Sequence, residues 1–90
     1  MDIITSAPRD LAFPPVYDRA EFDPRHNPIS AVIRQMEVGA ITHWRVATAS
    51  DYATVRGISY DLGRTLGRRF RARRLSPGLI EIRRMRDVIP

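Results

Sequence analysis

Arginine supplies every cationic side chain that could do chemistry in this sequence, since all fifteen Lys and Arg positions hold arginine. A guanidinium can grip a phosphate through two parallel hydrogen bonds and can also stack on a base. The arginines are densest in two neighbouring runs, which comprise Arg68, Arg69, Arg71, Arg73 and Arg74 and then Arg83, Arg84 and Arg86. Like charges placed so closely repel one another unless acids or a polyanion neutralise them. The pattern predicts a phosphate-binding surface, with arginine-rich codon usage and simple solubility as alternative explanations.

A second row of polar side chains recurs every four residues, which places its members on one face of a helix. The row consists of Arg56, Tyr60, Arg64 and Arg68. We expect it to extend the phosphate-binding surface, with Tyr60 either stacking on a base or bonding a phosphate. Together the two features predict a nucleic-acid-binding site, with DNA expected more than RNA. Its residues are Arg56, Tyr60, Arg64, Arg68, Arg69, Arg71, Arg73, Arg74, Arg83 and Arg84.

The sequence holds no motif typical of an enzyme. It lacks a Gly-rich phosphate loop and the H-E-x-x-H, G-x-S-x-G and C-x-x-C patterns. Asp51 and Asp61 would point about 80° apart on a helix, nearly three turns from each other, so they form no carboxylate pair. Asp61 is instead expected to pair with Arg64. Because no such motif is present, we predict no enzyme, no catalytic residue and no cofactor. With no Cys and only two His, we also predict no metal site.

The principal helix that must position these side chains is predicted over residues 50–66. Ser50 or Asp51 is the expected N-cap, and Gly67 is the expected C-terminal stop. Its apolar residues recur at spacings of three and four and are Val55, Ile58, Leu62 and Leu66. A shorter helix is predicted over residues 28–38. Its expected signals are Asn27 as N-cap, Pro28 at the first helical position and Gly39 after the last turn.

Three strands are expected to complete the domain. Residues 40–47 alternate so that Thr42, Trp44 and Val46 point to one side. Residues 68–85 form a hairpin around a Ser76-Pro77-Gly78 turn. The predicted fold is therefore α+β in the order α-β-α-β-β, with a three-stranded antiparallel sheet packed against two helices.

Residues 1–26 contain four prolines without a sustained period, which predicts an extended N-terminal arm ahead of a single basic domain over residues 27–90. The arm carries large rings that could fill pockets on a partner, namely Phe13, Tyr17 and Phe22. A flexible leader with scattered aromatic residues is the alternative interpretation. Net charge also differs between the two parts of the sequence. Residues 1–37 hold four Arg and six acids, a net charge of −2, whereas residues 38–90 hold eleven Arg and four acids, a net charge of +7.

Four short runs resemble small basic proteins of phages and mobile elements: Met36-Glu-Val-Gly, Asp51-Tyr-Ala-Thr-Val-Arg, Leu66-Gly-Arg-Arg-Phe-Arg-Ala-Arg and Ile80-Glu-Ile-Arg-Arg. The similar stretch covers residues 36–84. The resemblance implies a compact domain that works in phage or host nucleic-acid transactions. The Pro-rich arm departs from the pattern, so its role stays open.

Two functions follow from these features. The first is a nucleic-acid-binding accessory or regulatory protein. The second is a phage-type inhibitor or accessory subunit that binds a host protein through its aromatic arm. A domain of this size buries a small core, so a homo-oligomer is expected. With no signal peptide and no apolar run long enough to span a membrane, we predict a cytoplasmic protein, in the host cytoplasm if phage-encoded.

Overall fold

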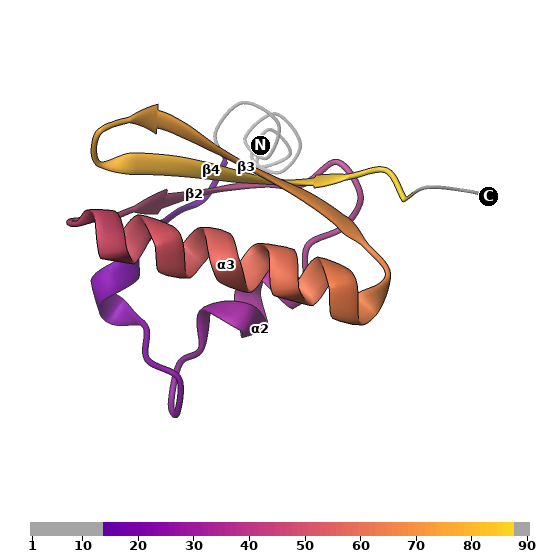
Figure 1. The fold of residues 1–90 in the computed structure, drawn as a ribbon, viewed down its shortest axis with the longest axis horizontal. Helices are drawn as coiled ribbons and strands as arrows, with labels where there is room; N and C mark the ends of the chain where they lie inside the picture. Colours follow the sequence, from indigo (N-terminus) through magenta and orange to yellow (C-terminus); the bar gives the residue numbers. More distant parts are fainter. Residues whose placement is uncertain (1–13, 88–90) are drawn as a thin grey trace, which may run out of the picture.

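The computed structural model describes residues 14–87, which form a sheet with two helices against one of its faces (Figure 1). The strands are β1 (Val16–Asp18), β2 (Ile41–Arg45), β3 (Arg69–Ser76) and β4 (Leu79–Met85). The helices are the 3-10 turn η1 (Arg19–Glu21), α2 (Ile29–Arg34) and α3 (Ala49–Leu66). The α+β class and the two predicted α-helices are confirmed.

The sheet differs from the predicted one in strand number and direction. It has four strands in the order β1-β2-β4-β3, with β1 parallel to β2 and the other pairs antiparallel. The additional strand lies inside the segment expected to be an arm. The prediction of a three-stranded antiparallel sheet in the order α-β-α-β-β was therefore wrong, because a parallel strand precedes that series.

Aromatic stacking holds β1 in place. Tyr17 lies beside Trp44 in the parallel register, and their rings stack with centroids 4.8 Å apart. Phe22 follows after η1 and brings its ring to 5.1 Å from Trp44. The buried indole therefore collects two of the three rings that were predicted to bind a partner, within the same chain. The third, Phe13, lies outside the described residues.

Helix α3 begins and ends with well-defined caps. The Thr48 hydroxyl accepts a hydrogen bond from the Asp51 N–H at 3.1 Å, so Thr48 is the N-cap in place of the predicted Ser50 or Asp51. Gly67 ends the helix with φ 69°, as predicted. Within residues 14–87, no helix has the length and apolar character needed to cross a membrane.

Helix α2 is shorter than its predicted range and starts differently. Pro28 occupies the N-cap position without a side-chain hydrogen bond. Asn27 was the predicted cap, but its side-chain amide donates to the Glu21 carbonyl at 2.9 Å, and its backbone pairs with Asp23. The amide is thus used to close the preceding loop.

The core lies between the helices and the inner face of the sheet. Its fully buried members come from every layer and include Trp44, Ile33, Val55, Ile80 and Ile82. The predicted stripe of α3 contributes Val55 and Leu62 as buried residues, whereas Leu66 at the helix end is 37% exposed. This packing fixes which side chains of the strands face away from the helices.

Candidate nucleic-acid interface

Strand alternation gathers arginines on the sheet face that the helices leave open. Ile80 and Ile82 point into the core, so their neighbours Glu81 and Arg83 point outward. The outward arginines belong to β2, β3 and β4, and we call them the arginine face: Arg45, Arg69, Arg71, Arg73 and Arg83. All five are exposed. The predicted clustering of Arg69, Arg71, Arg73 and Arg83 therefore forms one surface, and Arg45 joins it.

Register makes this surface electrostatically unbalanced. Arg71 stands directly opposite Arg83 on the neighbouring strand, and such like-charged pairs repel. Glu81 stands opposite Arg73, and its carboxylate lies 3.8 Å from an Arg83 nitrogen and 3.6 Å from His43 Nε2. Among the described strand residues of this face, Asp18 is the other carboxylate, and it accepts the Ala20 N–H. Five guanidinium groups thus share a face with two carboxylates.

Two predicted site residues lie on the inner side of the sheet instead. Arg84 is opposite the buried Phe70, and its guanidinium donates to the Met36 carbonyl at 2.9 Å and to Asp87 at 3.1 Å. Only 11% of its side chain is exposed. The bond to Met36 ties β4 to the segment after α2, so the Arg84 guanidinium is used within the fold. Arg74 also lies on the helix side of the sheet, but it stays exposed, and its guanidinium carbon lies 4.5 Å from the centroid of the Tyr52 ring.

The predicted row on α3 lies beside the free edge of β3. The Arg56 guanidinium carbon is 5.1 Å from the centroid of the Tyr60 ring. The Tyr60 hydroxyl accepts a hydrogen bond from the Ala72 N–H at 3.3 Å. Arg64 forms the predicted ion pair with Asp61 at the helix surface. The helix row therefore flanks the sheet instead of continuing its open face.

A surface hollow connects this row with the arginine face. It has a volume of about 350 Å³ and is lined by Tyr60, Gly63, Arg64, Arg68, Arg69 and Phe70. Arg68 is held at its rim by a 2.8 Å hydrogen bond to the Arg34 carbonyl. Arg69 belongs to both the hollow and the arginine face. Basic side chains are thus continuous from the end of α3, around the start of β3, to the open face of the sheet.

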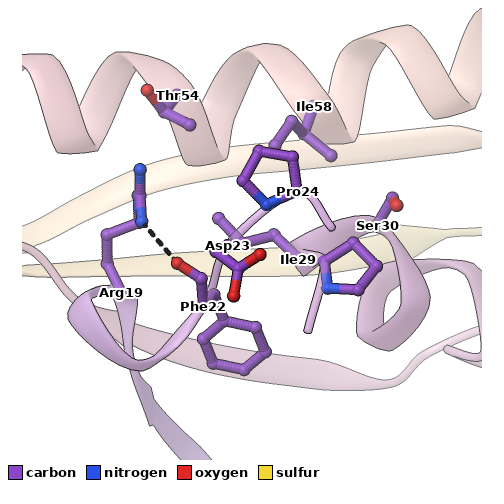
Figure 2. A pocket seen from close by; sticks show the side chains of 9 residues that line it. Arg19, Phe22, Asp23, Pro24, Ile29, Ser30, Thr54 and Ile58 are labelled. Atoms are coloured by element: carbon purple, nitrogen blue, oxygen red, sulfur yellow. Dashed lines mark hydrogen bonds between the residues drawn. The ribbon is translucent and has the colours of Figure 1, made fainter. Parts of the chain in front are cut away.

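A separate pocket lies in the helix layer, between the loop after η1 and the first half of α3 (Figure 2). Its volume is about 200 Å³, and its apolar lining residues are Phe22, Pro24, Pro28, Ile29 and Ile58. Arg19 at its rim donates to the Phe22 carbonyl at 3.2 Å. Backbone N–H groups of His26 and Arg25 bond Asp23 and lower the pKa of its carboxyl group. These charged groups hold the loop closed around the pocket.

Two residues beside the predicted site were not predicted from the sequence. Arg45 belongs to the arginine face but lies outside both arginine runs, so only its outward strand position pointed to it. Tyr52 contacts Arg74 and precedes Arg56 by one helical turn, a spacing that the sequence shows. In residues 14–87, no group of three or more His, Cys, Asp or Glu side chains is placed to hold a metal ion.

No family model, curated protein or solved structure matches this chain. The resemblance of residues 36–84 to phage and mobile-element proteins therefore stays a prediction.

Proposed function

We propose that this protein is a nucleic-acid-binding accessory or regulatory protein whose arginine face contacts the sugar–phosphate backbone. The observation that carries the proposal is the register that sets Arg71 directly against Arg83, with Arg69 and Arg73 on the same side of β3. Glu81 offsets part of this repulsion, and an external anion would neutralise the rest. A nucleic acid supplies closely spaced anions and releases its condensed counterions when arginine replaces them.

Spacing along β3 supports phosphate as the ligand. Alternate residues of a strand lie about 7 Å apart on one face, which is comparable to the separation of neighbouring phosphates along a nucleic-acid strand. Arg69, Arg71 and Arg73 can therefore meet successive phosphates. Phosphate contacts position a protein without reading bases. The affinity that this face provides is largely independent of sequence, and DNA is the expected form.

The alternative, a protein-binding factor anchored by its aromatic arm, has less support. Tyr17 and Phe22 are packed on Trp44, so these rings already have partners in this chain. Phe13 alone remains for an anchor among the three predicted residues. The nucleic-acid proposal needs no such rearrangement, because the arginine face is exposed as it stands.

Fluorescence anisotropy with labelled DNA tests the proposal. The variant Arg71→Gln with Arg73→Gln removes two charges from the arginine face while keeping most of each side chain's length. Its matched control is Arg25→Gln with Arg34→Gln, which removes the same charge from exposed positions in the helix layer. We expect the first variant to weaken DNA binding at least about tenfold. The control should bind within about twofold of the unaltered protein.

Equal losses in the two variants would show that net charge, and not the arginine face, governs binding. Absence of binding by the unaltered protein at low salt would contradict the proposal altogether. In that event, a partner captured by the full chain but not by a chain lacking residues 1–13 would favour the protein-binding alternative.

A further inference from the structure

Tyrosine and arginine alternate along the flank of α3. Tyr52, Arg56, Tyr60 and Arg64 follow one another at intervals of four residues, and Arg74 of β3 joins them from the sheet. We call these five residues the ladder. Within it, Arg74 lies over the Tyr52 ring at 4.5 Å and Arg56 lies over the Tyr60 ring at 5.1 Å.

The rings of the ladder are fixed from behind. Tyr52 is half-buried against the core. Tyr60 is half-buried, and its hydroxyl is bonded to the Ala72 N–H on the free edge of β3. Arg56 and Arg74 are exposed, and their guanidinium carbons lie within about 5 Å of the ring centroids. The ladder therefore presents two guanidinium groups to solvent beside half-buried rings.

This arrangement suits unpaired bases. Every base has a π-face that can stack on an aromatic ring or a guanidinium plane. In a duplex those faces are covered by neighbouring base pairs, so only unpaired nucleotides can use them. A single strand that stacks on the ladder can also reach the hollow, because Tyr60 and Arg64 belong to both.

Distances along α3 fit more than one stacked base. The eight residues from Tyr52 to Tyr60 correspond to about 12 Å of helix. An extended single strand can span this interval with a small number of nucleotides, leaving its phosphates for Arg68 and Arg69 at the hollow. Tyr60 and Arg64 of the ladder line the same hollow as Arg69 of the arginine face, so a single strand on the ladder would lie next to that face.

We infer that the ladder is a base-stacking site and that the ligand of this protein is single-stranded nucleic acid. The inference rests on the proposed function, because the arginine face supplies the phosphate contacts. It adds a preference for single strands over duplexes, which phosphate contacts alone do not provide.

The test compares one labelled oligonucleotide of about 20 nucleotides, single-stranded and as a duplex, by anisotropy with the full chain. The variant Arg56→Lys with Arg74→Lys keeps both charges but removes both planar surfaces. Its control, Arg25→Lys with Arg34→Lys, makes the same exchange in the helix layer. We expect the ladder variant to lose at least about fivefold in affinity for the single strand, with duplex binding unchanged and the control unaffected.

A second variant, Tyr52→Leu with Tyr60→Leu, should show the same selective loss, with thermal unfolding verifying that it is folded. Equal losses for both forms of DNA, or no loss for either, would overturn the base-stacking site while leaving the arginine face standing. If the unaltered protein binds neither form, the proposed function fails and the ladder inference fails with it.

Discussion

Glu81 controls the charge balance of the arginine face. Its carboxylate lies within 4 Å of both His43 and Arg83, and the residue is 9% exposed despite its place on the open face of the sheet. A carboxylate in this position reduces the repulsion between arginines and also opposes an approaching phosphate. Stability of the fold and affinity for a polyanion should therefore respond in opposite directions when its charge is removed.

The substitution Glu81→Gln tests this balance. We expect it to lower the free energy of unfolding by about 1 kcal/mol, because Arg83 and the opposing Arg73 lose a neighbouring carboxylate. Affinity for DNA should rise about two- to fivefold. Urea denaturation and anisotropy measure the two effects, with Glu21→Gln, which changes an exposed acid outside the strands, as the control. Unchanged or weaker DNA binding would contradict the assigned role of this face.

Elements with a long, regular pattern could be predicted from the sequence. The stripe of α3 and the alternation of Phe70, Arg71, Ala72 and Arg73 each extend over enough residues to fix which side is buried. Gly67 ends α3 because a glycine accepts the left-handed conformation without strain. The outward group Arg71, Arg73 and Arg83 followed directly from this alternation.

Features that depend on distant contacts could not be predicted in this way. Strand β1 has three residues, too few for a period, and it forms because Tyr17 stacks on Trp44 far along the chain. Arg84 belongs to an arginine run, but the strand phase turns it inward to the Met36 carbonyl. The N-cap of α3 was missed because Thr48, Ser50 and Asp51 all have suitable side chains and lie within four residues.

The two glycines of α3 provide a prediction at the scale of the helix. A Cβ added at Gly57 would meet nothing within 4 Å, whereas one at Gly63 would lie 2.9 Å from the Arg68 carbonyl oxygen. Gly57→Ala should therefore stabilise the protein by up to about 1 kcal/mol through helix propensity. Gly63→Ala should destabilise it by about 1–3 kcal/mol, because the chain after α3 passes too close.

Thermal unfolding compares the two glycine variants directly. A gain of about 1 kcal/mol corresponds to a midpoint about 4–8 °C higher for a domain of this size. Equal shifts of the two midpoints would show that Gly63 does not provide the close approach of helix and strand.

At the scale of the whole molecule, part of the predicted arm is built into the fold. The Tyr17 ring covers Trp44, so Tyr17→Ala should cost about 2 kcal/mol, less than the loss of a fully buried ring. Val16→Ala is the control, because Val16 is 46% exposed on the same strand and should change stability by less than about 0.5 kcal/mol. Urea denaturation measures the free energy of unfolding of both variants. Equal losses in Tyr17→Ala and Val16→Ala would contradict the role of the Tyr17–Trp44 stack.

The packing of Tyr17 on Trp44 also determines which truncation can test whether the N-terminal arm binds a partner. Removing residues 1–26 deletes β1 and uncovers Trp44, so a lost partner could reflect a damaged core. Removing residues 1–13 leaves β1, η1 and the loop before α2 intact. Light scattering tests the predicted homo-oligomer. It is applied to the full chain and to the chain lacking residues 1–13, before and after nuclease treatment.

The salt dependence of duplex binding tests the central claim most directly, because a duplex engages the arginine face without the ladder. If all five arginines of this face meet phosphates, the logarithm of the association constant should fall with the logarithm of salt concentration with a slope of about −4.5. Arg71→Gln with Arg73→Gln should make that slope shallower by about 1.8, and Arg25→Gln with Arg34→Gln should leave it unchanged. A slope that is the same in all three proteins would contradict the claim.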